Sequence, residues 1–345
     1  MSFAKPLSWN LFGTSFDGKD VSVHEAFEEA GLNFSVDKDP LVRMPQTILD
    51  AYLSGRTPIW RPTSGNVITT HKATYREDTN TTLGVVGEGY GVVQNEKAFD
   101  FLNFIEEAAG EKLQIATAGA LGDGQRVFIT AKLGADCYLN PQDAINNYVV
   151  FSTTHDGSGA VSCFFTPIRI ICQNTLNMAI RECPNKVVFK HSKYVGDRIN
   201  FDDESNRKKA FEVFAKSVNF SKQFSENMLM LKSQNVTEAE TQDFAAKIAF
   251  TPAQFKLWKL NGRNAERVDE ISTRAENIYN SLRTAIDSGI GQNYNRGTKV
   301  WLLNGLTTYL HNEKKWKSPQ DEFKSLMDGD GARKVQFGYD LLMAA

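Results

Sequence analysis

The sequence predicts an α+β protein, with an antiparallel β-hairpin core and packed helices, followed by a helical C-terminal half. Alternating, β-branched runs separated by Asp-Gly turns fill the middle of the chain, which is typical of antiparallel strands. Beyond Phe201 the apolar residues recur at three- and four-residue steps, which indicates amphipathic helices. We therefore expect three regions: an N-terminal arm with short helices at 1–55, the α+β hairpin core at 56–200 and a helical region at 201–345.

The expected core contains two hairpins. ITTHKATYR at 68–76 and TTLGVVG after it read as strands. LQIATAGAL and QRVFITAKL flank the turn Gly-Asp-Gly at 122–124, and NYVVFSTTH and AVSCFFTPI flank Asp156-Gly157. A Gly-containing turn between two such runs predicts a hairpin in each case. KVVFKHSKY, which starts at Lys186, is a further strand candidate.

Helices are predicted from caps and breakers. Asn95 is a candidate N-cap for the helix of NEKAFDFLNFIEEAA, and Gly110 is its expected stop. In the C-terminal half, Thr237 and Glu240 form a capping-box pattern and Pro252 can open the next helix. Further helices are expected at 202–233, 266–286, 300–310 and 320–327.

Composition excludes several classes of protein. The chain of 345 residues is 41% hydrophobic, which is enough for a large core, and no apolar run approaches the roughly 18 residues of a membrane span. The N-terminus has no apolar stretch like that of a secretory leader. The four cysteines form no Cys-x-x-Cys pattern, and the five histidines show no metal-ligand spacing. We expect a cytoplasmic protein with no membrane partner, no metal and no cofactor.

Charge is distributed unevenly along the chain. Residues 1–120 hold 10 basic and 16 acidic side chains, whereas residues 163–235 hold 12 basic and 7 acidic ones. A basic central segment could contact phosphates, which supply most of the non-specific affinity for nucleic acids. The alternative is a solvated helix face without a ligand.

The polar sequence THDGSG is the first candidate site. His155, Asp156 and Ser158 lie within it, and a histidine base oriented by a carboxylate is one interpretation. Neighbouring residues in a tight turn point in different directions, however, and Asp-Gly suits a two-residue hairpin turn with positive φ. The turn interpretation is favoured, and it leaves open that the turn presents His155 and Ser158 to a ligand.

Arg169 is the second candidate because it lies between Ile168 and Ile170. An arginine in such a run either pairs with a buried carboxylate or reaches an anionic ligand. Asn174 and the residues beside it read as a helix start, whose free amides could hold a phosphate together with Arg169. The alternative is that Asn174 or Thr175 merely caps that helix.

The segment KVVFKHSKYVGDR is the third candidate, because cations alternate with aromatic rings along it. Such alternation suits single-stranded nucleic acid, whose bases stack on rings while its phosphates attract cations. An edge strand with solubilising lysines is the competing interpretation. The residues concerned are Lys186, Phe189, Lys190, Lys193, Tyr194 and Arg198.

Several motifs together resemble a known family. GYGVVQNEKAFDF, GDGQRVF, THDGSGA, PIRIICQNTLNMA and RGTKVWLLNGLTTYLHN occur in this order over about residues 45–315. They resemble the phage/plasmid-like proteins grouped as domain of unknown function nine-three-two. The resemblance implies an origin in phages or plasmids, and hence the cytoplasm of the host cell. The hairpin–helix pattern is also similar to that of phage single-strand annealing proteins.

The leading functional hypothesis is a mobile-element protein that binds single-stranded nucleic acid without a cofactor, and that anneals strands as a homo-oligomer. No catalytic residue is assigned under this hypothesis. One alternative is a nucleic-acid-modifying enzyme that uses His155 with Asp156. Another is an anti-defence protein that binds a host partner.

Overall fold

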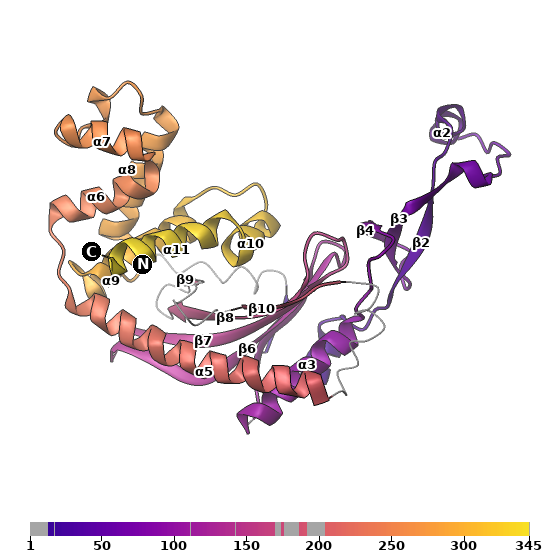
Figure 1. Cartoon of the computed structure of the whole chain (residues 1–345), viewed down its shortest axis with the longest axis horizontal. Helices are drawn as coiled ribbons and strands as arrows, with labels where there is room; N and C mark the ends of the chain where they lie inside the picture. Colours follow the sequence, from indigo (N-terminus) through magenta and orange to yellow (C-terminus); the bar gives the residue numbers. More distant parts are fainter. Residues whose placement is uncertain are drawn as a thin grey trace.

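The computed structural model describes residues 13–16, 18–110, 112–141, 143–169, 174–175, 186–191 and 204–344. Antiparallel sheets occupy the N-terminal half of the described chain and helices fill the C-terminal half (Figure 1). The predicted α+β class is therefore confirmed. Among the described residues, no helix is both long and apolar enough to span a membrane.

The larger sheet contains seven of the described strands. Six follow the order β1-β5-β6-β7-β8-β10, and β9 pairs with β8 beside this path. All of its pairs are antiparallel, and both predicted hairpins are present as β5–β6 and β7–β8. Its strands are β1 (Gly13–Ser15), β5 (Gln114–Leu121), β6 (Arg126–Asn140), β7 (Asp143–Thr154), β8 (Val161–Arg169), β9 (Asn174–Thr175) and β10 (Lys186–Phe189).

Helices cover both faces of this sheet. Successive side chains of β6 point to opposite faces, as in any strand. On one face, Phe128 of β6 contacts the ring of Phe323. The next residue, Ile129, points to the opposite face, where its cross-strand neighbour Phe151 contacts the ring of Phe99. The sheet core is consequently buried from two sides, and the last six residues of β7 are all buried. The helices that supply these rings are α3 (Asn95–Ala109) and α10 (Pro319–Asp328).

A second, three-stranded sheet extends away from the first as an arm, with α2 at its far end (Figure 1). Its order is β2-β3-β4, and β2 has a register shift between Pro40 and Leu41, where proline lacks an amide donor. Its elements are β2 (Val36–Val42), α2 (Gln46–Leu53), β3 (Val67–Arg76) and β4 (Thr82–Gly87). The region expected as an N-terminal arm thus contributes β1 to the larger sheet and β2 to the smaller one.

The helix α5 (Glu204–Ser233) is the longest element and runs along the larger sheet (Figure 1). Its buried residues Phe220, Phe224, Met228 and Leu231 recur every three or four positions and form one apolar stripe. This stripe belongs to the same core cluster as the sheet residues, so the helical half and the sheet share one core.

The C-terminal helices pack around α9 (Lys299–Thr308), in which every residue is buried. Gly305 allows the closest approach in this packing, because a Cβ there would lie 2.7 Å from the Cα of Ile286. The helices α8 (Thr273–Ser288) and α11 (Asp330–Met343) pack directly on α9. The helix α6 (Glu238–Ala249) packs on both of these, and α7 (Pro252–Leu260) packs on α6. The short helix α1 (Val23–Glu29) packs on α3 at the other end of the chain's core.

Two helix predictions are wrong in detail. The single helix expected at 266–286 is a short 3₁₀ turn followed by α8, because the hydroxyl of Ser272 accepts from the amide of Ala275 and starts the helix there. The helix α11 begins at Asp330, beyond the last helix expected from the sequence. Cys137 and Cys163 are free, buried thiols, and the other two cysteines lie outside the described residues.

Candidate functional site

The candidate functional site lies where the THDGSG loop meets the base of the arm. The main-chain amide of His155 donates to the carbonyl of Gln125 over 2.8 Å, and its carbonyl accepts from the hydroxyl of Thr74 over 2.6 Å. Gly84 of β4 approaches the loop so closely that a Cβ there would lie 2.5 Å from the Cα of Asp156. The loop therefore joins the larger sheet to the arm.

The predicted two-residue turn is wrong in its length. β7 ends at Thr154 and β8 begins at Val161, so the connection spans residues 155–160. Only Gly157 within it has a positive φ, of 76°. The connection is longer than two residues because the backbone of His155 is bonded to Gln125 and to Thr74 of the arm. The chain reverses direction only after these two hydrogen bonds.

The ring of His155 is completely buried, so the loop does not present it to a ligand, in contrast to the interpretation that THDGSG left open. Its Nε2 lies 2.7 Å from Oδ1 of Asn95, while Nδ2 of Asn95 donates to the carbonyl of Leu32 over 3.0 Å. Because the amide nitrogen is engaged as a donor, Oδ1 must accept, and Nε2 of His155 carries the proton. Burial, with His191 nearby, lowers the pKa of His155 to about 3, so the ring is neutral near pH 7.

Asn95 has a different role from the predicted one. The N-cap of α3 is Gln94, and Asn95 is the first helical residue. Its side chain is buried and is occupied by Leu32 and His155 instead of the helix amides. An asparagine just before an amphipathic helix is usually its N-cap. The spacing of residues therefore could not indicate that the side chain of Asn95 bonds to Leu32 and His155 instead.

A second histidine packs into the same region from the distant end of β10. The ring of His191 stacks on Tyr90 with 4.7 Å between centroids and an angle of 19°. Its Nδ1 lies 3.1 Å from the carbonyl of Gly91, which can only accept, so Nδ1 carries the proton. The hydroxyl of Tyr90 donates to the carbonyl of Thr154 over 2.7 Å. Tyr90 thus connects His191 to the end of β7.

The two histidines share an uncommon property. Nδ1 of His155 and Nε2 of His191 are buried and have no hydrogen-bond partner among the described residues. Burial also lowers the pKa of His191, which keeps its ring neutral. Both rings therefore carry one bare acceptor nitrogen in an environment that disfavours the imidazolium. No group of three His, Cys, Asp or Glu side chains suited to a metal occurs in the described part of the chain.

Asp156 does not form the histidine–carboxylate pair that a catalytic interpretation needs. It is half-buried, and its Oδ1 accepts from the amide of Ser158 over 2.8 Å, as in an Asx turn. The Nε2–H of His155 is directed to Asn95. Since His155 is also inaccessible, the described geometry gives no general base at this loop.

The helix expected after Asn174, which the phosphate cradle at Arg169 requires, lies outside the described residues. Asn174 and Thr175 themselves form the short strand β9, in which they pair with Arg169 and Ile168 of β8. β10 pairs with β8 only from Val161 to Phe164. The opposite end of β8, at Ile168 and Arg169, pairs with β9 instead. The backbone of Asn174 therefore lies in a ladder beside that of Arg169.

The basic–aromatic segment is described only in part. Lys186 and Phe189 lie in β10, which pairs with β8 and is the last strand on the path of the larger sheet. Val188 is 50% exposed and Lys190, directly after the strand, is also exposed. Lys193, Tyr194 and Arg198 lie outside the described residues.

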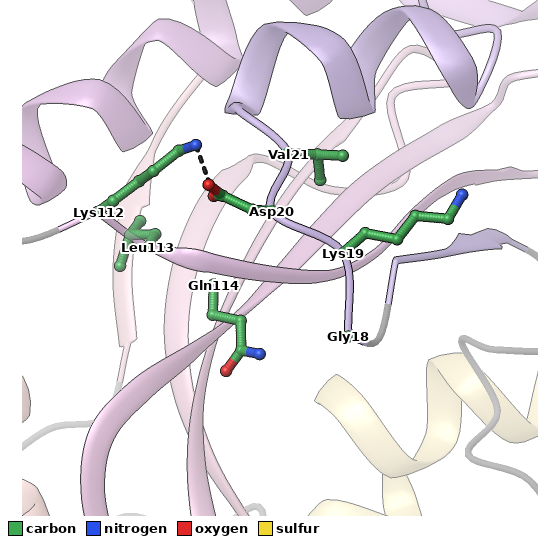
Figure 2. A pocket seen from close by; sticks show the side chains of 7 residues that line it. All are labelled: Gly18, Lys19, Asp20, Val21, Lys112, Leu113 and Gln114. Carbon is green, nitrogen blue, oxygen red and sulfur yellow. Dashed lines mark hydrogen bonds and ion pairs between the residues drawn. The ribbon is translucent and has the colours of Figure 1, made fainter.

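A cavity of about 250 Å³ lies elsewhere, beside the start of β5 (Figure 2). Among the residues that line it, Lys112 donates to Asp20 over 2.7 Å (Figure 2). Lys19, which also lines it, pairs with Glu29 at 3.8 Å. The hydrogen bond that Lys112 donates to Asp20 raises the pKa of Lys112. Because both cations already have carboxylate partners, this cavity offers no free charge to a ligand.

A family model described as Domain of unknown function (DUF932) matches residues 82–333, which is more than half of the chain. The chain belongs to this family. No curated protein and no solved structure matches it. The match confirms the resemblance inferred from the motifs, and the family domain includes Tyr90, His155 and His191. The end of the arm that carries α2 precedes the matched region.

Proposed function

We propose that this family member binds single-stranded nucleic acid along β10 and the residues that follow it. The observation that carries the proposal is the exposed Lys190 at the end of a strand that pairs with β8 alone among the described strands. Such a strand offers unpaired backbone amides beside a cation, and both groups are common phosphate contacts.

The distribution of charge along the chain also supports nucleic-acid binding. Residues 163–235 carry 12 basic and 7 acidic side chains. Lys208 and Lys222 on α5 are exposed, and neither they nor Lys190 form an ion pair with a described residue. Cations without carboxylate partners can neutralise phosphates and release counterions. The proposal extends to annealing of complementary strands by an assembly of copies.

The test is the salt dependence of binding to a labelled single-stranded oligonucleotide. Lys190→Glu should weaken binding and reduce the slope of log K against log salt by about 0.7, since one phosphate contact is lost. Lys256→Glu is the matched control, because Lys256 is an exposed lysine on α7. Binding that is absent in the wild type, or lowered equally by both variants, would contradict the proposal.

A further inference from the structure

The end of the arm exposes an unusual amount of apolar surface. We define the arm tip as residues 42–68. Half of the large apolar side chains that are exposed in the described chain lie in it. The helix α2 has no buried residue, Leu53 on it is 78% exposed, and Ile59 beyond it is 99% exposed. Exposed apolar side chains that gather in one segment indicate an interaction site.

The arm tip is also basic. It carries three arginines, Arg43, Arg56 and Arg61. Asp50 is the single carboxylate among residues 40–76, so the tip has a net charge of +2. All three arginines are exposed, and none forms an ion pair with a described residue. The ligand that the tip fits is therefore an anion with apolar parts.

One short loop of the tip combines the two properties. The sequence RTPIWRP at 56–62 places an arginine on each side of Ile59, with Arg56 before it and Arg61 after it. Pro58 and Pro62 restrict the backbone within the same loop, so less conformational freedom is lost when the loop binds a ligand. The loop thus presents one nearly fully exposed aliphatic side chain and two unpaired cations on a stiffened backbone.

The shape of the arm gives this loop access to a groove. β4 pairs with β3 only as far as His71. Beyond this point β2 and β3 form a two-stranded ribbon that ends at the pair of Val42 with Val67. The ribbon extends away from the larger sheet and carries the tip at its far end (Figure 1). Ribbons of this kind enter the grooves of duplex DNA, so the tip can reach a groove while the rest of the chain stays outside it.

The apolar side chains of the tip suit a duplex better than a single strand. Single strands bind by stacking their bases on aromatic rings. The most exposed large apolar side chains of the tip, those of Leu53 and Ile59, are aliphatic instead. Proteins that bind the minor groove insert such side chains between base steps, and they use arginine in the groove and at its phosphates. An isoleucine with an arginine on each side in the sequence therefore matches a minor groove.

We propose that the arm tip binds the minor groove of a DNA duplex, with Ile59 inserted between base steps and with Arg56 and Arg61 at the neighbouring phosphates. The proposal rests on the proposed function for the class of ligand, and it adds base-paired DNA, the product of annealing, as the ligand of a second surface. This surface lies at the far end of the arm, apart from β10 (Figure 1). The two surfaces can therefore be tested separately.

The first measurement compares the affinities for a labelled DNA duplex and for one of its strands. Ile59→Asp should weaken duplex binding about tenfold or more, because it places a carboxylate against phosphates. It should leave single-strand binding unchanged, since single strands are assigned to β10. Leu260→Asp is the matched control, because Leu260 is 73% exposed and lies outside the tip, and it should bind both ligands like the wild type.

The second measurement tests the arginines through the salt dependence of duplex binding. The double variant Arg56→Gln, Arg61→Gln should reduce the slope of log K against log salt by about 1.8, since about 0.9 is lost with each phosphate contact. Arg267→Gln is the matched control and should keep the slope of the wild type. Arg267 is exposed and, like the arginines of the tip, forms no ion pair with a described residue.

The third measurement reports the insertion itself. A fluorescent aminopurine base, which is quenched while it is stacked, is placed within the duplex. The wild type should raise its fluorescence, because an inserted Ile59 unstacks a base step. Ile59→Ala should abolish this rise and keep the salt slope, because it shortens the side chain without changing the charge.

A wild type that binds no duplex, or tip variants that bind the duplex like the wild type, would overturn the inference. A tip that instead contacts a bilayer or another protein gives this result. An aminopurine signal that the wild type leaves unchanged would overturn the insertion of Ile59. Tip-dependent duplex binding by a protein without affinity for single strands would contradict the proposed function and support this inference. Single-strand binding that depends on Lys190, together with duplex binding that is independent of the tip, would do the reverse.

Discussion

Acid should destabilise the protein through His155. Its pKa is lowered from 6.5 to about 3 by burial. The unfolded chain therefore takes up a proton more readily than the folded one, and stability is full above pH 6.5 and falls as the pH drops towards 3. Each pH unit in this window costs about 1.4 kcal/mol, so the loss is about 2 kcal/mol at about pH 5. Because this pH is well above the folded pKa, the loss depends mainly on the unfolded value.

The measurement is the free energy of unfolding in urea at about pH 8 and about pH 5, for the wild type and for His155→Gln. Glutamine cannot titrate, and its amide can still donate to Asn95. His191 has a lowered pKa in both proteins, so its contribution cancels in the comparison. The wild type should lose about 2 kcal/mol more than the variant. An equal loss in both proteins would refute the assignment of a neutral, buried His155.

Two further substitutions test the base of the arm. Gly84→Ala should cost about 1–3 kcal/mol, because the new Cβ meets the backbone of Asp156 and the chain must shift. Gly89→Ala, whose Cβ would enter open space, should leave the melting temperature almost unchanged and is the control. Tyr90→Phe removes the donor to the carbonyl of Thr154 and should cost about 1 kcal/mol in urea unfolding. A Tyr90→Phe protein as stable as the wild type would show that this hydrogen bond contributes nothing.

The local structure could be predicted from the sequence because its causes are local. The Gly-Asp-Gly turn at 122–124 joins β5 to β6, and the capping box at Thr237 starts α6, as the patterns indicate. The site could be predicted only in part. His155 was identified, but its burial depends on Asn95 and Thr74, which are 60 and 81 residues away. No periodicity reports contacts over such distances.

The stack of His191 on Tyr90 was missed for the same reason, although both residues lie within segments that the sequence had marked. GYG carried the family resemblance and KHSK carried the basic–aromatic pattern, yet nothing in either indicates the other. β9 was missed because Asn and Thr suit a helix cap as well as a strand. Asn174 and Thr175 form a strand because the end of β8 that β10 does not reach is available for pairing, which depends on the sheet as a whole.

The arm places two very different stabilities within one strand. Val67 and Ile68 at the tip end of β3 pair with β2 alone, whereas Thr74 near the other end is buried and bonded to the carbonyl of His155. A two-stranded ribbon is marginal by itself, so the amides at the tip exchange with solvent through local opening, while those near Thr74 exchange only when the sheet junction opens. A protease that cuts within 42–68 would leave that junction intact. The chain thus carries half of its exposed large apolar side chains, among the described residues, on a part that we expect a protease to cut without opening the junction.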